Sequence, residues 1–384
     1  MFISRFCKHN IYQTVNKSIA ILPGDGIGPE VTAQAVKIIK AIEKKFNHLF
    51  DLKEYLIGAA AMDKGLEPLP AETKEGCLKA DAVLFGAIGD PRYDVNPHAS
   101  ERPEQGLLKL RKEMDLYGNL RPIKSYRKLY ALSPLKEDQV QNVNLLICRE
   151  LTGGLYFGKK EKADDGSWAS DECYYHKDEI SRITRLAFDE ARQRRKKVTL
   201  VDKANVLETG RLWRSTVQEI QKTSYPDVEL DMLFVDNAAM QLILNPRQFD
   251  VILTENMFGD ILSDEASVIV GSIGLLPSGS YGDERALFEP IHGSYPQAAG
   301  RNIANPLATI LAAGMMMDHF GLLAEEDLIN SAVEYIIQEG MGTMDMAPRQ
   351  IVSCSHLGDL ISELIQEQKT NWGEVKKKFN DQFN

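Results

Sequence analysis

Three arginines stand in short apolar segments that lie far apart in the chain. Arg111 ends the segment GLLKLR, Arg121 lies in NLRP, and Arg149 follows the apolar run LLIC at the end of a strand pattern. A guanidinium binds a carboxylate through two parallel hydrogen bonds, so three converging arginines would hold a small polycarboxylate. Each arginine taken singly also fits a surface ion pair, and the sequence does not show whether the three converge.

Three aspartates form a second candidate group. Asp260 and Asp264 are four residues apart in NMFGDILSDEAS, and Asp236 follows an apolar strand pattern. Residues four apart share one face of a helix, and carboxylate oxygens without His or Cys nearby suit Mg²⁺ or Mn²⁺. The alternative is a pair of acids that stabilises the start of a helix through its dipole. Tyr156 in GLYFG and Lys203 in DKAN are candidate acid and base groups, although each also has an ordinary structural explanation.

A glycine-rich turn, PGDGIGP at residues 23–29, joins a strand pattern at 18–22 to a helix pattern. Such a turn suits phosphate binding at a helix N-terminus. The spacing does not fit G-x-G-x-x-G, because the third glycine would fall at Val31, and no acidic partner follows about 20 residues later. We therefore expect a tight structural turn that lines a cleft, with a Rossmann loop as the weaker alternative.

Strand patterns alternate with helix patterns along most of the chain, which predicts an α/β architecture. The further strands expected in this part are 82–88, 198–201, 230–235 and 249–254. Between residues 119 and 177 the texture changes to strand-like pieces without intervening helices, which predicts antiparallel sheet at 144–148, 155–159 and 172–176. After residue 271 we expect a Gly/Ser/Pro loop, followed by helices at 306–319, 325–339 and 357–368.

Composition limits the class of protein. The 384 residues include 45 Lys and Arg against 55 Asp and Glu, and the net charge of −10 disfavours nucleic-acid binding. The longest apolar run, 307–317, is too short to span a bilayer, and five scattered cysteines without a C-x-x-C favour a reducing compartment, the cytoplasm. Residues 1–17 are basic and predict a ragged extension, with an organelle-targeting remnant as the alternative. The run RQRRKK (192–197) predicts a solvated helix end, with an anion-docking surface as the alternative.

Taken together, the ordered segments resemble the isocitrate/isopropylmalate dehydrogenase family of β-decarboxylating dehydrogenases. The resemblance runs from residue 19 to about 365 and rests on these segments: ILPGDGIGPEV, GLLKLRK, NLRP, RELTGGLYFG, DKANVLE, NMFGDILSDEAS, GLLPS, FEPIHGSYPQAAGRNIANP and the TMD turn at 343–345. It implies a two-domain α/β fold that is not a Rossmann fold. The cofactor domain would be discontinuous, 1–116 with 271–384, and 117–270 would form an inserted domain for substrate, metal and dimerisation.

The resemblance also implies an activity: oxidation of a 2-hydroxy dicarboxylate by NAD, followed by loss of the carboxylate on C3. It implies that Mg²⁺ or Mn²⁺ is bound by the three aspartates, that Asp236 also contacts substrate, and that the three arginines fix the carboxylates. Lys203 would be the base for the hydroxyl proton and Tyr156 the acid that protonates C3. The active site would be shared in a homodimer, with Lys203 and Asp236 of one chain beside Asp260 and Asp264 of the other.

Substrate and cofactor choice are assigned to further residues by the same resemblance. Leu107 would bury an isopropyl group, worth roughly 1.5 to 3 kcal/mol if fully desolvated, which implies a role in leucine biosynthesis. D-malate, tartrate, isocitrate or homoisocitrate are alternative substrates, and a non-catalytic binding subunit is the alternative from another class. The positions implied in cofactor binding are Glu104, Asn205, His292, Gly293, Ser294, Gln297, Asn302 and Asn305. Gln297 stands where NAD-using members usually have an acid, and Tyr295 and Asp90 depart from commoner small residues; NAD is still favoured because a lysine, typical of NADP users, is absent.

Overall fold

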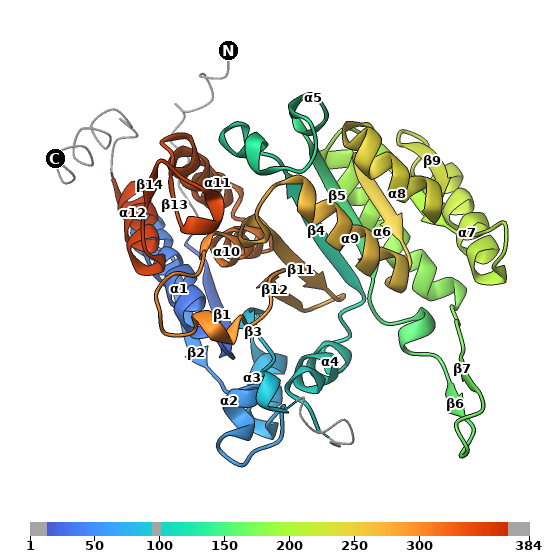
Figure 1. Ribbon diagram of the computed structural model, residues 1–384, viewed down its shortest axis with the longest axis horizontal. Helices are drawn as coiled ribbons and strands as arrows, with labels where there is room; N and C mark the ends of the chain where they lie inside the picture. The colour runs from blue at the N-terminus through green and yellow to red at the C-terminus, as the bar shows by residue number, and fades with distance from the viewer. Residues whose placement is uncertain (1–13, 94–100, 368–384) are drawn as a thin grey trace.

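A ten-stranded sheet runs through the whole molecule in the computed structural model, which describes residues 14–93 and 101–367 (Figure 1). The outer strand pairs on both sides are parallel, whereas the three pairs β12–β11, β11–β4 and β4–β5 are antiparallel. In spatial order the strands are β2 (Leu49–Glu54), β1 (Asn16–Gly24), β3 (Ala82–Ala87), β12 (Ala286–Pro290), β11 (Pro277–Tyr281), β4 (Gly118–Lys124), β5 (Asn144–Glu150), β10 (Val251–Thr254), β8 (Lys197–Asp202) and β9 (Glu229–Phe234).

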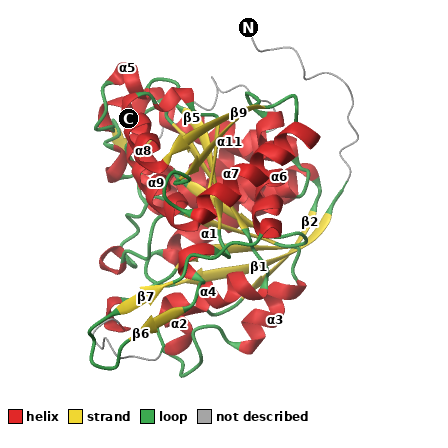
Figure 2. Cartoon of the chain, turned by 90° about the vertical axis from the view of Figure 1, so that its right-hand side faces the viewer, coloured by secondary structure: helices red, strands yellow, loops and turns green. Residues whose placement is uncertain are grey.

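Helices cover this sheet in two groups (Figures 1 and 2). The first group lies with β1, β3 and β12: α1 (Gly28–Phe46), α10 (Leu307–His319), α11 (Leu323–Gln338) and α12 (Cys354–Gln366). The second lies with β5, β8 and β10: α6 (Lys177–Gln193), α7 (Glu208–Ser224), α8 (Val235–Leu244) and α9 (Asn256–Ile269). Smaller helices are α2 (Ala59–Met62), α3 (Ala71–Lys79), α4 (Pro103–Glu113) and α5 (Glu137–Val140).

The central strands are apolar on both faces because helices cover both. In β5, Leu146 and Cys148 pack with α6 and α7, while Leu145 and Ile147 pack with α8 and α9. Side chains of a strand alternate between its two faces, so a strand buried on both sides has a continuous apolar sequence. Burial on both faces explains the apolar patterns at 82–88, 198–201 and 249–254, which are confirmed as β3, β8 and β10. The pattern at 230–235 is confirmed as the edge strand β9, whose residues are half-buried or exposed.

Three sequence predictions of strands and loops are wrong. Residues 155–159 and 172–176 are not strands; the antiparallel hairpin lies between them, as β6 (Lys160–Lys162) and β7 (Ala169–Asp171), which projects from the body in Figure 1. The predicted loop after residue 271 contains β11, whose turn-forming residues are held between β12 and β4. The predicted helices at 306–319, 325–339 and 357–368 are confirmed as α10, α11 and α12, with residue 368 outside the described part.

The glycine turn is a close-packed structural turn, as its spacing indicates. Gly24 and Gly26 have positive φ angles, and a Cβ atom on them would lie 1.9 Å from the Ala87 carbonyl oxygen and 2.0 Å from that of Ser294. The amide of Ile27 also donates to the Ser294 carbonyl at 2.7 Å. Only glycine permits this approach, so the turn brings the segment around Ser294 against the start of α1.

The basic run at 192–197 is occupied by ion pairs. Arg192 pairs with Asp227 at 2.6 Å, and Arg194 pairs with the buried Asp250 at 2.9 Å. Lys197 pairs with Asp231 at 2.6 Å. These partners match the solvated helix end expected from the sequence and leave little charge for docking an anion.

Two further sequence expectations concern the ends and the cysteines. The expectation for residues 1–17 lies mostly outside the described residues, although Asn16 and Lys17 already belong to β1. The four cysteines within the described ranges are all free thiols, and Cys7 lies outside them. Within the same ranges, no helix is long and apolar enough to cross a membrane. The division into 1–116 with 271–384 and 117–270 stays a prediction; its boundary falls in the sheet between β11 and β4.

Candidate active site

The three arginines converge near the middle of the sheet. Arg111 lies in the last turn of α4, while Arg121 and Arg149 lie on the neighbouring strands β4 and β5. Burial lowers the pKa of Arg121, and the positive charges of Arg149 and Arg111 lower it further. Burial and Arg111 likewise act to lower the pKa of Arg149. The three guanidiniums therefore lie close enough to repel one another in a partly buried region. An anionic ligand bound there would be stabilised, because it would offset this repulsion.

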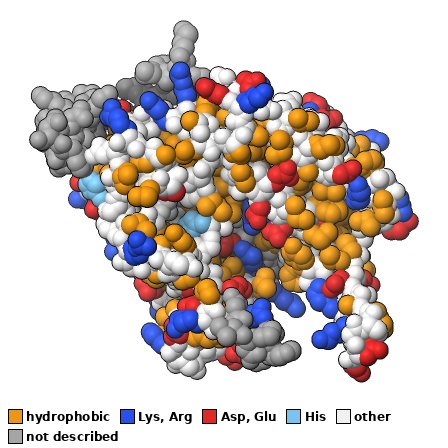
Figure 3. All heavy atoms as spheres, in the orientation of Figure 1, with side chains coloured by type: hydrophobic (Ala, Val, Ile, Leu, Met, Phe, Trp, Pro, Cys, Tyr) orange, Lys and Arg blue, Asp and Glu red, His pale blue; other side chains and the backbone are white. Residues whose placement is uncertain are grey.

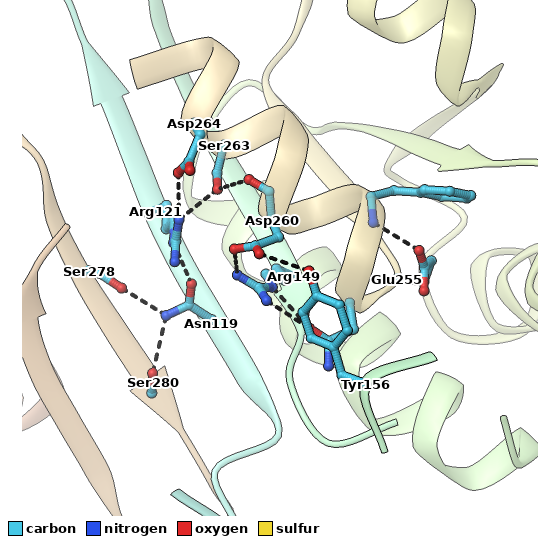
Figure 4. A network of polar contacts seen from close by, with 12 residues as sticks. Asn119, Arg121, Arg149, Tyr156, Glu255, Asp260, Ser263, Asp264, Ser278 and Ser280 are labelled. Atoms are coloured by element: carbon cyan, nitrogen blue, oxygen red, sulfur yellow. Dashed lines mark hydrogen bonds and ion pairs between the residues drawn. The ribbon is translucent and has the colours of Figure 1, made fainter. Parts of the chain in front are cut away.

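Two acids of α9 face these arginines (Figure 4). Asp260 forms an ion pair with Nη1 of Arg149, and Asp264 lies 3.5 Å from Nη1 of Arg121. The same Nη1 of Arg121 donates to the hydroxyl of Ser263 at 2.6 Å. Both aspartates lie on one face of the helix, as their spacing of four predicts.

Tyr156 completes this cluster from the short 3₁₀ helix η3 (Gly154–Tyr156). Its hydroxyl donates to Oδ2 of Asp260 at 2.9 Å, and 43% of the residue remains exposed. Partial burial and the hydrogen bond to Asp260 raise the pKa of Tyr156. The phenol therefore keeps its proton well above neutral pH, and the guanidinium of Arg149 lies 5.9 Å from the centre of its ring.

Arg111 differs from the other two arginines in its partner. Its Nη2 donates to Oε1 of Glu289 on β12 at 2.5 Å, so its charge is compensated by an acid that is 6% exposed. Its Nε is buried and has no hydrogen-bond partner within the described residues. A buried donor without an acceptor is costly, so this atom marks a place in the cluster where an acceptor is missing.

Lys203 and Asp236 form a second pair, away from the arginine cluster. Lys203 follows β8 and Asp236 opens α8 after β9, and because β8 and β9 are adjacent parallel strands, their following residues meet. Nζ of Lys203 lies 2.5 Å from Oδ1 of Asp236, and this hydrogen bond lowers the pKa of Asp236. Asn205, two residues after Lys203, is exposed on the same turn.

The three aspartates do not meet within one chain. Asp260 and Asp264 lie with the arginines, whereas Asp236 lies with Lys203. Across residues 14–93 and 101–367, no three His, Cys, Asp or Glu side chains are grouped so that they could hold a metal ion. Within the described part of one chain, the three aspartates therefore do not form a single metal site.

A pocket of about 930 Å³ lies between the loop that follows β12 and the residues that precede α12. Four of the predicted cofactor positions line it: His292, Gly293, Asn302 and Asn305. Burial lowers the pKa of His292, and its buried Nε2 has no hydrogen-bond partner among the described residues. Ile27 of the glycine turn and Tyr295 also line this pocket. A neutral, unsatisfied ring nitrogen at the wall of a pocket is suited to a polar ligand.

The other predicted cofactor positions lie outside the pocket lining. Ser294 and Glu104 both approach Gly89: a Cβ built there would lie 2.6 Å from Oε1 of Glu104 and 3.6 Å from Oγ of Ser294. Gln297 is exposed in the 3₁₀ helix η6 (Pro296–Ala298). Asp90 pairs with Arg92 at 2.8 Å.

Several polar residues in this region were not identified from the sequence. Asn119 accepts a hydrogen bond from Nε of Arg121 at 2.8 Å, and Asn256 accepts from Nη2 of Arg149 at 2.8 Å. Asn119 carries a usable signal, because it precedes Arg121 by two residues and so shares its strand face. Asn256 carries none, since its contact with Arg149 spans 107 residues.

The two leucines at the start of α4 differ in burial. Leu107 is buried, 7% exposed, in a cluster with Leu110 and Ile57, whereas Leu108 is 51% exposed. Leu108 lies three residues before Arg111 and therefore on the same side of α4. The assignment of the isopropyl contact to Leu107 from the sequence stays a prediction, and the spacing alone does not distinguish the two leucines, because they lie four and three residues before Arg111.

A family model described as isocitrate/isopropylmalate dehydrogenase matches residues 18–361. The chain belongs to the isocitrate/isopropylmalate dehydrogenase family. Among curated members of this family, it is 54% identical over 338 residues to 3-isopropylmalate dehydrogenase of Priestia megaterium, covering 87% of this chain and 91% of that protein. It is 52% identical to 3-isopropylmalate dehydrogenase of Thermotoga maritima, covering 91% and 99%.

Solved structures agree with membership of the isocitrate/isopropylmalate dehydrogenase family. An isocitrate dehydrogenase from Methylococcus capsulatus superposes with a TM-score of 0.81 at 34% identity, covering 91% of this chain and all of that chain. A β-decarboxylating dehydrogenase from Thermococcus kodakarensis superposes with a TM-score of 0.76 at 37% identity, covering 91% and 96%. The fold implied by the sequence resemblance is thereby confirmed.

Proposed function

We propose that this protein is a 3-isopropylmalate dehydrogenase of leucine biosynthesis. It would oxidise (2R,3S)-3-isopropylmalate with NAD and release CO₂ to give 4-methyl-2-oxopentanoate. The convergence of Arg111, Arg121 and Arg149 beside Tyr156 carries this proposal, because a dicarboxylate substrate needs a concentrated positive charge next to a proton donor. The identities of 50% and more to proteins named 3-isopropylmalate dehydrogenase support it over most of the chain.

The chain's own groups have distinct roles in this reaction. The three guanidiniums bind the two carboxylates, and the unpaired Nε of Arg111 supplies one donor. NAD, when bound, would supply the hydride acceptor for C2. Lys203 accepts the proton of the 2-hydroxyl during this oxidation, and loss of the C3 carboxylate as CO₂ then leaves an enolate. Tyr156 donates its hydroxyl proton to C3 of this enolate. The raised pKa of Tyr156 is consistent with an acid that keeps its proton until then.

The residues present suit a divalent cation of the Mg²⁺ or Mn²⁺ type. Asp260 and Asp264 offer hard carboxylate oxygens one helical turn apart, and Asp236 of a second copy would be the third ligand and would also contact substrate. Such a cation would supply Lewis-acid stabilisation of the negative charge that develops on the substrate oxygen. Asp260 and Asp264 now pair with Arg149 and Arg121, so cation binding would release these guanidiniums for the substrate.

We propose a homodimer whose two active sites each combine residues of both chains. Helices α8 and α9 pack together and present exposed apolar side chains, and Figure 3 shows hydrophobic groups gathered over this part of the surface. The exposed residues of this face are Met240, Ile243, Leu244, Ile261 and Val268. Exposed apolar patches of this kind mark contact surfaces, and α8 and α9 carry the very aspartates that must meet.

The pocket lined by His292 suits NAD. Its unsatisfied Nε2 offers a hydrogen-bond group, and its remaining wall is largely apolar. The side-chain amides of Asn302 and Asn305 are held in place by hydrogen bonds to Ser355 and Asp345. Gly293 has open space where a side chain would be, so a ligand can approach the backbone there. Ser294 and Glu104, which meet at Gly89, would lie toward the nicotinamide end, with Asn205 contributed from the turn after β8. Gln297 can accept a hydrogen bond from a ribose hydroxyl of NAD. Because Gln297 carries no negative charge, it would not repel the additional phosphate of NADP, so NADP is the cofactor to compare with NAD.

Substrate choice is assigned to the start of α4. We propose that Leu107 forms the floor of an apolar subsite and that the exposed Leu108 contacts the isopropyl group directly.

The decisive experiment follows the absorbance of reduced nicotinamide with Mg²⁺, NAD or NADP, and each of 3-isopropylmalate, isocitrate, D-malate and tartrate. Rapid reduction of NAD with 3-isopropylmalate alone supports the proposal. Preference for another acid reassigns the substrate, and no reduction with any of them favours a binding subunit.

We propose that the protein acts in the cytoplasm, because the four cysteines of the described residues are free thiols, as is usual in a reducing compartment.

A further inference from the structure

Behind two of the three arginines lies a buried asparagine rather than an acid. Oδ1 of Asn119 accepts from Nε of Arg121 at 2.8 Å, and Oδ1 of Asn256 accepts from Nε and Nη2 of Arg149 at 3.1 and 2.8 Å. Both asparagines are 1% exposed. We propose that Asn119 and Asn256 are positioning residues that orient Arg121 and Arg149 for the substrate carboxylates without neutralising their charge. This role rests on the proposed function.

The orientation of the Asn119 amide is determined by its neighbours on β11 (Figure 4). Its Nδ2 donates to the hydroxyls of Ser278 at 2.7 Å and Ser280 at 3.1 Å, and lies 3.3 Å from the carbonyl oxygen of Gly279. A carbonyl oxygen only accepts, so the amide nitrogen must face β11 and the amide oxygen must face Arg121. Three contacts on one strand thus fix the acceptor that holds Nε.

Asn256 is fixed in a similar way from the other side. Its Nδ2 donates to the carbonyl oxygen of Gly153 at 3.2 Å, and its backbone amide donates to the hydroxyl of Tyr175 at 3.0 Å. Again a carbonyl acceptor determines which end of the amide faces the guanidinium. The same solution therefore occurs at Arg121 and at Arg149, on adjacent strands.

An amide and a carboxylate have nearly the same shape but opposite consequences for charge. A carboxylate at position 119 would also accept from Nε, but it would cancel the positive charge that a ligand carboxylate needs. Arg111 shows the contrast, because Glu289 binds it at 2.5 Å. The acids that form ion pairs with Arg121 and Arg149 are Asp264 and Asp260, which are also the proposed ligands of the cation, whereas Glu289 acts on Arg121 only through its charge. With a neutral amide behind each of them, neither arginine has an ion-pair partner among its direct contacts once those aspartates bind the cation, and both can pair with ligand carboxylates.

The test compares Asn119→Asp with Asn119→Ala in the full-length dimer. The readouts are KM and kcat for 3-isopropylmalate, and its Kd by calorimetry with Mg²⁺ and without NAD. Asn119→Ala removes the acceptor for Nε of Arg121, together with the contacts of Asn119 to β11, and should raise KM and Kd about fivefold. Asn119→Asp keeps the acceptor but adds a charge, and should raise both by more than tenfold, with kcat changed less than about threefold.

Controls separate positioning from folding. Ser278→Ala removes one anchor of Asn119 without touching Arg121, and should raise KM by no more than about twofold. The Kd for NAD should be unchanged in all three variants, because the pocket at His292 does not include these residues. A fall in Tm with unchanged KM in the Ala variant would show a merely structural role and overturn the proposal. An Asp variant that binds substrate as well as the native protein would overturn the requirement for neutrality.

Failure of this inference is distinguishable from failure of the proposed function. If the native protein does not turn over 3-isopropylmalate, the proposed function fails, and the same variants are compared by calorimetry with D-malate, isocitrate and tartrate. The affinity order of native, Ala and Asp variants should then hold for whichever dicarboxylate binds. If none binds to the native protein, both proposals are wrong, because three oriented guanidiniums must hold a dicarboxylate.

Discussion

Asp260 joins the hydroxyl of Tyr156 to the guanidinium of Arg149. Its Oδ2 accepts from Tyr156 at 2.9 Å, while its Oδ1 forms an ion pair with Nη1 of Arg149. One carboxylate therefore holds the proposed proton donor next to a proposed carboxylate-binding group. If Asp260 turns to a divalent cation, both are released together, which couples cation binding to the availability of the proton donor.

Tyr156→Phe should remove the proton donor and leave the arginine cluster intact. We expect kcat to fall on the order of 10² to 10⁴-fold, the usual range for loss of a general acid, with KM nearly unchanged. Because the pKa of Tyr156 is raised, loss of its proton should not limit the native activity until alkaline pH, above its ordinary value of 10.0. The check is kcat against pH for both proteins. An alkaline limb near neutrality that disappears in the Phe variant would contradict the raised pKa.

Lys203→Ala should abolish turnover while substrate binding persists. The arginines that bind carboxylates are elsewhere in the chain, so we expect kcat to fall at least about 10²-fold and the calorimetric Kd for 3-isopropylmalate to stay nearly constant. Removing Lys203 also lets the pKa of Asp236 rise toward its ordinary value. Lys177→Ala is a matched control, because Lys177 pairs with Glu219 at 2.7 Å on the surface. Undiminished activity of Lys203→Ala would refute its role as the base.

The parts of this site that the sequence predicted are those determined by local order. Asp260 and Asp264 share a helix face because of their spacing, and Lys203 and Asp236 meet because each follows one of two adjacent parallel strands. The family resemblance implied that the three arginines converge, but no local pattern shows it, since the convergence depends on the antiparallel register of β4 with β5 and on the position of α4.

The strand β11 shows why other parts were missed. Its sequence, Pro277–Tyr281, consists of turn-forming residues, and a single-sequence pattern gives a loop. Its serines are nevertheless buried, because Ser278 and Ser280 receive hydrogen bonds from Asn119 on β4. Burial of these hydroxyls depends on a partner about 160 residues away, and no local pattern carries that information.

A pH-dependent contribution to stability is expected from Glu326 on α11. Burial raises its pKa from 4.5 to about 7, with Asp318, Asp327 and Glu190 nearby and Asn330 donating to it at 3.3 Å. A carboxyl group whose pKa is raised by folding stabilises the protein fully below the unfolded value of 4.5, and this contribution is lost as pH rises through about 7.

Glu326→Gln should therefore flatten the fall in stability with rising pH. We expect the variant to match the native Tm near pH 5 and to exceed it near pH 8, because the buried charge is no longer formed. Thermal unfolding at both pH values is the measurement. Glu72→Gln, at an exposed position of α3, is the control and should follow the native curve. A Tm difference that is the same at both pH values would contradict a titration of Glu326.

Shared active sites predict complementation between two inactive variants. Lys203→Ala and Asp260→Asn should each be inactive as homodimers, because the single lesion of each variant is then present in both active sites. In a heterodimer, one site collects both lesions and the other has neither, so co-expressed chains purified through two different tags should recover about half of the native activity.

The control for this complementation pairs Lys203→Ala with Asp236→Asn. These two residues lie together in one chain, 2.5 Å apart, and would enter the same shared site. Every site of that heterodimer carries one lesion, so no activity should return. Recovery in both heterodimers, or in neither, would mean that Lys203 and Asp236 do not act on the arginine cluster of the neighbouring chain, and the apolar face of α8 and α9 would then need another partner.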